Sequence, residues 1–231
     1  MPFVQETLAS YRTRVLRVLR DAQQQFFNAQ GQTPGSDASF ADIDAWIVQA
    51  QRWRDLWSGG SRNYRANVPL TKGLDLYTLD GTAAALFPTD TVLDIINLWL
   101  IWGTRRLPMP ERSLSEVTAK TRQTVGFTGT PAMYCRYGSS QLFIATAPSS
   151  QFAADLDVAV LSTTLVAAAD VDPLPYPYTE PVVYYAASLA KGEGQQKFQD
   201  AEVLMATAIR KLNDIEGARA GQLTLESGGR K

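Results

Sequence analysis

The chain has 231 residues, 45% of them hydrophobic, and a formal net charge of −1. This composition supports a folded core, and the near-neutral charge argues against a dedicated nucleic-acid-binding protein, which needs clustered lysine and arginine. Because the sequence has no histidine and a single cysteine, Cys135, it excludes a Ser–His–Asp triad, a Cys–His pair, a classical zinc site and an intrachain disulfide.

Two amphipathic helices are predicted at the start of the chain. Apolar residues recur at three- and four-residue steps over 3–29, and again in a second stretch that ends near Trp57, where Gly59–Gly60 stops the helix. The loop between them is rich in Gly, Pro and Ser, and Ser39 with Asp42 resembles a capping box at the start of the second helix.

Three arginines, Arg14, Arg17 and Arg20, lie opposite the apolar stripe of the first helix. Side chains in such positions form either a solvated face or a contact with an acidic partner or with DNA. Both interpretations stay open at this point.

The character of the sequence changes after Gly60. Residues 61–173 contain short β-branched or aromatic runs separated by Gly and Pro, which predicts antiparallel strands. The clearest are a hairpin over 132–146 and an alternating strand over 151–161, and a short helix is predicted over 114–124.

Two local patterns in this segment predict particular contacts. Ser113 and Glu116 form a capping box at the start of the short helix. Cys135 alternates with Met133 and Tyr137 along a predicted strand, which indicates a buried structural thiol.

Two further helices, 180–191 and 195–216, are predicted on either side of the glycine-rich break "KGEG". The stretch before them, "DPLPYPYTEP" (172–181), alternates proline with tyrosine. Proline fixes φ, and side chains such as Tyr176 and Tyr178 order at low cost, which is typical of protein interfaces. These tyrosines can equally pack the segment onto the chain's own helices.

The predicted fold is α+β, with a helical bundle formed by the N- and C-terminal helices, an inserted antiparallel β-rich segment and a flexible C-terminal tail. The predicted boundaries are 1–60 for the N-terminal helices, 61–173 for the β-rich insertion with one short helix, 174–217 for the C-terminal helical hairpin that completes the bundle, and 218–231 for the tail. The tail has Gly and polar residues without a sustained apolar period.

Few residues could carry chemistry. Asp155 and Asp157 share one strand face, where paired carboxylates can bind a cation or share acid–base work, but a solvated face explains them equally well. Trp99 and Trp102 could bind sugars or stack on bases, although aromatic residues in an apolar strand are more often core. We predict no catalytic, cofactor-binding or metal-binding residue, and the most apolar stretch, 94–103, is too short to span a membrane.

The order of these patterns resembles the head-to-tail adaptor proteins of tailed bacteriophages, also called head-completion or connector proteins. The resemblance is carried by "LDLYTLDG" (74–81), "DIINLWLIWGTRRLP" (94–108), "GTPAMYCRYGSSQLFIATAP" (129–148), "FAADLDVAVLSTTL" (152–165), "LPYPYTEPVVYYAASLA" (174–190) and the amphipathic helix over 195–216. The chain departs from the pattern at "KGEG" (191–194), where such proteins often have a longer polar link, and this leaves the angle of the last helix open.

The resemblance implies a structural virion protein of the neck at the head–tail junction, made in the host cytoplasm. It implies a homo-oligomeric ring, usually twelvefold, which binds beneath the portal protein, meets the next tail or neck protein and lets double-stranded DNA pass without specific contacts. It implies no enzymatic reaction, no cofactor and no membrane. The tail would dock on the portal through Arg219, Gln222, Leu223, Leu225, Arg230 and Lys231, and contacts between subunits would involve Arg14, Arg17, Arg20, Tyr176 and Tyr178.

Two other functions are compatible with the residues. The first is a carbohydrate-binding or hydrolytic tail component that uses Trp99, Trp102 and the paired aspartates. The second is a regulatory helical oligomer with an inserted sheet.

Overall fold

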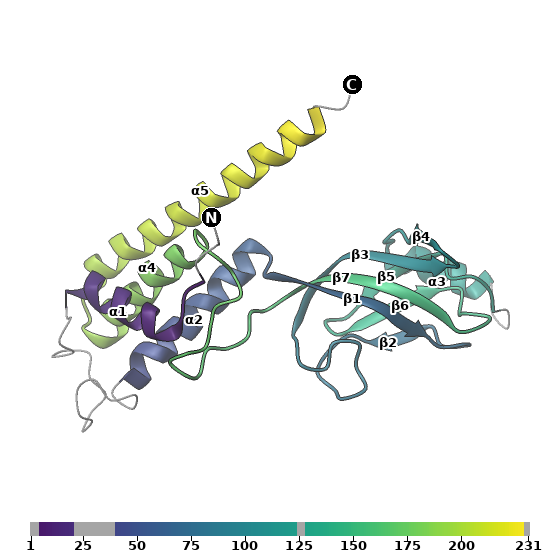
Figure 1. The fold of residues 1–231 in the computed structure, drawn as a ribbon, viewed down its shortest axis with the longest axis horizontal. Coiled ribbons are helices and arrows are strands. Elements are labelled where there is room, and N and C mark those ends of the chain that lie inside the picture. The colour runs from purple at the N-terminus through teal and green to yellow at the C-terminus, as the bar shows by residue number, and fades with distance from the viewer. Residues whose placement is uncertain (1–4, 21–39, 124–127, 229–231) are drawn as a thin grey trace. The chain divides into compact units, whose positions relative to one another are not determined.

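The computed structural model describes residues 5–20, 40–123 and 128–228 of the chain (Figure 1). It divides into two compact units, which we call the helical unit (residues 1–58 and 162–231) and the sheet unit (residues 59–161). The helices, the antiparallel strands and the class α+β agree with the sequence prediction.

Four helices and one π-helical turn form the described part of the helical unit. They are α1 (Leu8–Leu19), α2 (Ala41–Ser58), α4 (Thr179–Leu189), the π-helical turn Ala190–Gly194, and α5 (Phe198–Gly228). Helix α4 is the centre of this unit, because α1, α2 and α5 all pack against it. Its small residues Ala186 and Ala187, and Ala190 directly after it, are fully buried and let the neighbouring helices approach closely.

The first helix is shorter than predicted. A single helix over 3–29 is wrong, since α1 ends at Leu19 and Arg20 adopts a left-handed conformation with φ of 58°. The Arg20 amide donates hydrogen bonds to the carbonyls of Leu16 and Arg17, which closes the helix end. The rest of the prediction, with Ser39 of the expected capping box, lies outside the described residues.

The last helix is longer than predicted. We expected it to end at Glu216 and the tail over 218–231 to be flexible, but α5 continues to Gly228. The physical reason is that a glycine inside a helix costs only about 1 kcal/mol relative to alanine, and the residues around Gly217 and Gly221 are mostly good helix formers. Residues 229–231 lie outside the described chain.

The sheet unit contains two antiparallel sheets and one helix. The four-stranded sheet has the order β1-β7-β3-β4, and the three-stranded sheet has the order β2-β6-β5. The elements are β1 (Ser61–Leu70), β2 (Leu76–Thr78), β3 (Val92–Trp102), β4 (Arg105–Pro108), α3 (Leu114–Gln123), β5 (Met133–Tyr137), β6 (Gln141–Ala145) and β7 (Phe152–Val160).

The predicted hairpin and the predicted alternating strand are both confirmed. Strands β5 and β6 pair in antiparallel register across the turn. In β7, Leu156, Val158 and Val160 join the core, whereas Asp155 and Asp157 point to the other face of the sheet. The core of this unit is formed by buried residues of both sheets, including Leu70, Leu98 and Ile144.

Helix α3 begins with the predicted capping box. The Glu116 amide donates to Ser113 Oγ at 3.4 Å, and the Ser113 amide donates to Glu116 Oε2 at 3.1 Å. The Ser113 hydroxyl also donates to Glu116 Oε2 at 2.8 Å, and this hydrogen bond, followed by that from the Ser113 amide, holds the pKa of Glu116 below its ordinary value. The helix then packs Val117 against Cys135 and Ala145 of the small sheet.

Replacing Ser113 by alanine is expected to fray the start of α3. The loss of an N-cap speeds hydrogen exchange of first-turn amides about fivefold, which corresponds to the usual cost of such a substitution. The pKa of Glu116 should also rise toward its ordinary value in an NMR titration. Ser115→Ala is the matched control, and equal effects of the two substitutions would contradict the capping box.

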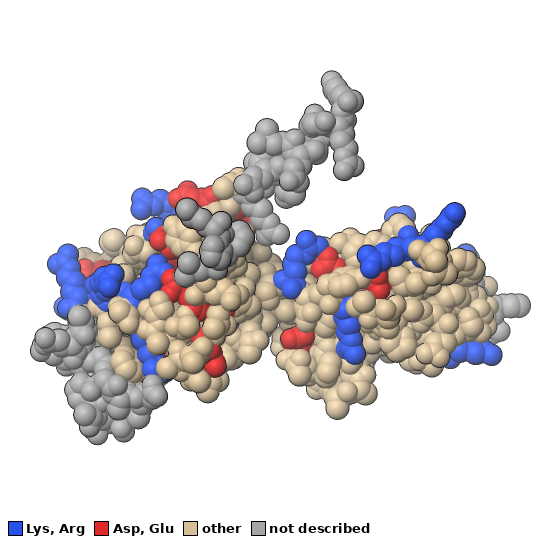
Figure 2. Space-filling view, viewed as in Figure 1, with Lys and Arg blue, Asp and Glu red and all other residues tan. Residues whose placement is uncertain are grey.

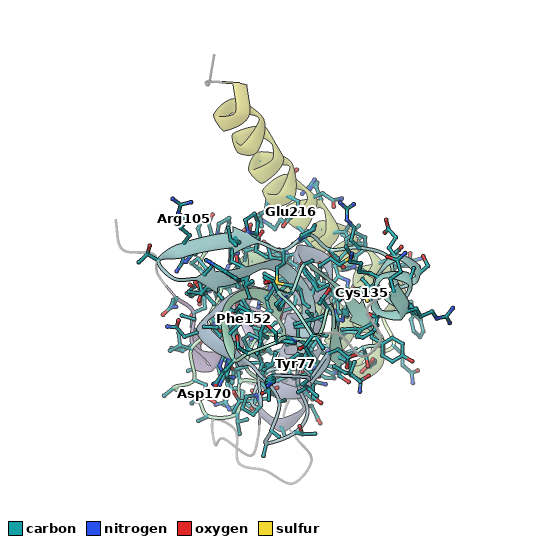
Figure 3. All side chains as sticks on the ribbon, turned by 90° about the vertical axis from the view of Figure 1, so that its right-hand side faces the viewer. Tyr77, Arg105, Cys135, Phe152, Asp170 and Glu216 are labelled. Atoms are coloured by element: carbon teal, nitrogen blue, oxygen red, sulfur yellow. The ribbon has the colours of Figure 1, made fainter. Side chains whose placement is uncertain are left out.

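Cys135 is buried, as predicted, and lies among the side chains of the sheet unit (Figure 3). Burial raises the pKa of its thiol above the ordinary value. The thiolate that would act as a nucleophile is therefore disfavoured, which is typical of a structural cysteine.

Candidate interaction surfaces

The three arginines of α1 and its C-cap differ in their surroundings. The Arg14 guanidinium lies 2.6 Å from a carboxylate oxygen of Glu6 and 3.8 Å from one of Glu180, so it is held within its own chain. Arg17 and Arg20 are exposed. Figure 2 shows lysine and arginine side chains gathered over the end of the helical unit where α1 lies. The structure thus leaves Arg17 and Arg20 available for a partner.

The proline–tyrosine segment before α4 is anchored through Asp172. One carboxylate oxygen of Asp172 accepts hydrogen bonds from the Tyr11 hydroxyl at 2.8 Å and from Arg54 at 2.6 Å, and the other accepts from the Leu174 amide. Tyr176 is exposed and Tyr178 is half-buried at the N-cap of α4. Thr179 is the first residue of α4, and the N-cap Tyr178 makes no side-chain hydrogen bond to the helix.

A buried ionic cluster lies behind this segment. The side chain of Arg54 is fully buried, and it pairs with Asp172 and, at 2.8 Å, with Asp55. Asp55 in turn accepts a hydrogen bond from the Ser162 amide, and Arg54 donates to the Ser162 hydroxyl. The cluster therefore joins α2 to Ser162 and Asp172, two residues of the segment that runs from β7 to α4. These contacts fix the position of that segment on α2.

The electrostatics of the cluster favour its charged form. Burial alone would lower the pKa of the Arg54 guanidinium, but the adjacent Asp172 carboxylate raises it above its ordinary value. Burial, and then the Asp172 charge, raise the pKa of the Tyr11 hydroxyl. Tyr11 thus stays protonated and donates a hydrogen bond to Asp172. The cluster therefore stabilises the packing of the helical unit and contains no group suited to proton transfer.

The cluster was not predicted from the sequence, although a signal for it exists. Ile43, Ile47, Ala50 and Arg54 follow one another at helical spacing, so Arg54 occupies the next position of the buried stripe of α2. A charged residue in an apolar stripe requires a buried partner of opposite charge. That partner, Asp172, is 118 residues away in the chain and cannot be found from local spacing.

The paired aspartates of β7 are engaged by neighbouring strands. Asp155 accepts hydrogen bonds from the Tyr64 hydroxyl at 2.7 Å and from the Asn67 amide at 3.0 Å, and it lies 2.8 Å from Arg106. Asp157 forms an ion pair with Arg62. Each carboxylate thus has its own arginine, which is the arrangement of a structural sheet face and differs from that of a general acid and base that share one substrate.

Asp155→Asn is expected to destabilise the sheet unit by about 1–2 kcal/mol at neutral pH. Burial alone would raise the pKa of Asp155, but the hydrogen bonds from Asn67 and Tyr64 and the charge of Arg106 lower it. A carboxylate with a lowered folded pKa adds stability above its ordinary pKa and loses that stability as the pH falls through the folded pKa.

The difference in unfolding free energy between wild type and Asp155→Asn should therefore shrink from about pH 5 to about pH 2. Urea unfolding at a series of pH values measures it. Asp75→Asn, at a half-buried aspartate of the loop before β2, is the control. A difference that stays constant with pH would contradict this account of the Asp155 site.

The two tryptophans do not form a joint platform. Trp99 and Trp102 are three residues apart in β3, so their side chains lie on opposite faces of the strand. Trp99 pairs across the sheet with Asp155, whereas Trp102 stacks on Phe152 with ring centroids 5.8 Å apart. The expectation that Trp102 belongs to the core is wrong, since half of its surface is exposed.

The described part of the chain offers neither a metal cluster nor a membrane span. Among these residues, histidine, cysteine and acidic side chains form no group that could hold a metal ion. None of the described helices is long and apolar enough to cross a membrane.

The end of α5 extends past the rest of the helical unit (Figure 1). Leu212 is buried against the unit, and the helix continues for about 24 Å beyond it at 1.5 Å per residue. The predicted docking residues Arg219, Gln222, Leu223 and Leu225 lie within this extension, and Arg230 and Lys231 lie outside the described residues.

Comparison with known proteins identifies the family. The family model described as SU10 adaptor protein, of phage head–tail adaptors, matches residues 6–226, which is nearly the whole chain. No curated protein matches the chain. The match includes both units and most of the α5 extension. The chain belongs to the SU10 adaptor protein family of phage structural proteins.

Proposed function

We propose that the chain forms the adaptor ring that joins the portal to the tail of a tailed phage and continues the DNA channel, without catalysing a reaction. The observation that carries the proposal is the α5 extension beyond Leu212, in a chain of the adaptor family. A helix that continues beyond its packed part offers a docking element. We propose the portal protein as its partner and a twelvefold ring as the assembly.

The charge of the chain is compatible with a DNA channel. With a formal net charge of −1, the chain as a whole is not basic, and a channel wall with few phosphate anchors lets DNA slide. The two exposed arginines Arg17 and Arg20 are proposed to face a neighbouring subunit and to stay out of the lumen. The sheet unit is proposed to meet a neighbouring subunit or the next tail component.

The hydrolytic alternative has less support. It needs two carboxylates available to one substrate, whereas Asp155 and Asp157 are buried beneath Tyr64, Arg62 and Arg106. It also needs two tryptophans on one face, and the tryptophans of β3 lie on opposite faces. A structural role requires neither.

Size-exclusion chromatography with light scattering tests the proposal. The chain is mixed with its portal ring and then compared with a variant that lacks residues 217–231. The full chain is expected to add to the portal in a symmetric multiple, and the truncated chain is expected to remain unbound. A chain that ignores the portal in both forms would overturn the proposal.

A matched variant separates the loss of contacts from the loss of helix. Gly217→Ala with Gly221→Ala keeps the length of α5 and favours the helix by about 1 kcal/mol at each position. If the extension docks as a helix, this variant should bind the portal at least as tightly as the wild type. Weaker binding would mean that the segment must leave the helical conformation to dock.

A further inference from the structure

The helical unit has an open side between α2 and α5. Both helices pack against α4, but they meet each other only at their margins. On α4, Tyr185 stacks on Trp53 of α2 with ring centroids 4.3 Å apart, while the preceding residue, Tyr184, lies under Lys211 of α5. Consecutive helical residues point in different directions, so α2 and α5 contact adjacent sides of α4.

This open side is rich in aromatic and sulfur-containing side chains. Phe198, Met205 and Ile209 follow one another at helical spacing on the flank of α5 that faces away from α1. Phe198 is 66% exposed and Met205 is 42% exposed. We call the surface formed by Trp53, Trp57, Tyr185, Phe198 and Met205 the aromatic face.

Charged residues of both signs lie beside the aromatic face, since Lys197 before Phe198 and Arg52 before Trp53 are exposed. Glu202 lies one turn after Phe198 on the same flank of α5 and is exposed. Glu193, in the π-helical turn, is also exposed and accepts a hydrogen bond from the Trp46 indole at 3.0 Å. The carboxylate of Glu202, one turn from the exposed Phe198, favours a partner surface that is apolar and carries a cation opposite it.

The opposite flank of α5 has those properties. There α1 and α5 enclose a cavity of about 410 Å³, whose apolar lining comes from Val18, Leu19, Val203 and Leu204. Val203 is 67% exposed at its edge. Arg20, Lys191 and Asp200 also line this cavity, and Arg17 lies one turn before Arg20 on α1, so the cations here outnumber the carboxylate. We call this flank the basic notch.

We propose that the aromatic face of one copy of the chain binds the basic notch of a second copy, with Phe198 seated at the cavity and Glu202 opposite Arg20. The inference deepens the proposed ring, on which it rests, by assigning its subunit contact. Two observations favour a second copy of the chain as the partner. Glu202 on one flank of α5 and Arg20 beside the other have opposite charges. The apolar cavity on the second flank can receive an exposed aromatic side chain from the first. The two faces differ, so each copy uses both, and such head-to-tail contacts produce rings or filaments rather than closed dimers.

Charge exchange between two variants tests the contact. Glu202→Lys and Arg20→Glu each place like charges opposite one another in the proposed interface, and both positions are exposed, so the fold should be unaffected. Sedimentation velocity of the chain alone, at up to about 1 mM, is expected to show self-association of the wild type, weakened at least tenfold in each variant, a fold-change typical of an interfacial charge reversal. Mixing the two variants in equal amounts should restore it.

The mixture is the decisive sample. Wherever the two different variants meet, the contact pairs either the two original charges or the two exchanged charges, and both pairings are attractive. Phe198→Ser should weaken association without rescue in any mixture, and Gln199→Lys, on the exposed side of α5 between the two flanks, is the matched control without effect. A wild type that stays monomeric throughout, or a mixture that behaves like its components, would overturn the proposal.

The outcome can be separated from that of the portal experiment. Variants that no longer self-associate but still add to the portal as a complete symmetric ring would contradict the assigned contact between subunits and leave the proposed function standing. Self-association that is intact in a chain that ignores the portal would sink only the proposed function.

Discussion

Replacing Arg54 by methionine is expected to destabilise the helical unit by about 3–5 kcal/mol, the usual cost of breaking a buried ion pair by removing one partner. Methionine fills a similar volume, so the loss is electrostatic. Asp55 and Asp172 would remain buried without their cation, and the Ser162 hydroxyl would lose a donor. Few single substitutions in this unit should cost as much.

The measurement can be confined to the helical unit. Trp46, Trp53 and Trp57 lie in this unit, and the remaining two tryptophans, Trp99 and Trp102, lie in the sheet unit. In a background with Trp99 and Trp102 replaced by phenylalanine, fluorescence during urea unfolding reports the helical unit alone. Arg52→Met, at an exposed position of the same helix, should change stability by less than about 0.5 kcal/mol.

A loss of unfolding free energy below about 1 kcal/mol in Arg54→Met would contradict this account. Loss of a surface ion pair costs that little, whereas removal of a buried cation from two carboxylate partners should cost more. The sign of the result is also informative. A stabilised variant would mean that the two aspartates are protonated or solvated once Arg54 is gone.

Gly60→Ala is expected to be the most damaging glycine substitution in the sheet unit. Gly60 has φ of +70°, and a Cβ atom at this position would lie 2.3 Å from the Val160 carbonyl oxygen and 2.9 Å from a methyl group of Leu93. Val160 pairs with Ser61 at the start of β1, so relieving the clash would open the β1–β7 ladder at its end. The expected loss is about 3 kcal/mol or more, of which the left-handed backbone explains only about 1–2 kcal/mol.

Gly59 provides the matched control. It has nearly the same backbone conformation, with φ of +75°, but a Cβ atom there would have no neighbour within 4 Å. Gly59→Ala should therefore show only the conformational cost. Hydrogen exchange with mass spectrometry on peptides from β1 and β7 measures the difference, and equal exchange in the two variants would show that the close approach to Val160 is not limiting.

The strands and the short helix could be predicted because their signals are local. In β7 the alternation of Leu156, Val158 and Val160 with the two aspartates identifies the strand and the face that joins the core, whereas a solvated face for the aspartates is wrong because both are buried. The Ser113–Glu116 capping box identifies the start of α3. The predictions of the strand, its core face and the helix start depend on residues within a few positions of one another, and the structure confirms them.

The ends of α1 and α5 could not be predicted for a shared physical reason. Helix ends depend on small free-energy differences, and apolar periodicity does not report them. At Arg20 the chain turns despite continued periodicity in the sequence, and at Gly217 the helix continues despite a glycine. Capping hydrogen bonds and neighbouring helix formers decide such positions.

The candidate surfaces were predicted only in part. The exposed arginines Arg17 and Arg20 could be assigned from the helical wheel of the first helix, but the ion pairs of Arg14 with Glu6 and Glu180 depend on how α1 and α4 pack. The aromatic face likewise combines α2, α4 and α5, and the stack of Trp53 on Tyr185 joins residues far apart in the sequence. Surfaces built from several helices are not visible in any one stretch.

Electron cryomicroscopy of the portal mixed with the full chain tests the central claim most directly. The account predicts a symmetric ring of chains beneath the portal, with the α5 extension against portal subunits and with Arg17 and Arg20 at contacts between neighbouring chains. A ring whose α5 ends lie free in solvent while another element touches the portal, or one in which these arginines line the channel, would contradict it.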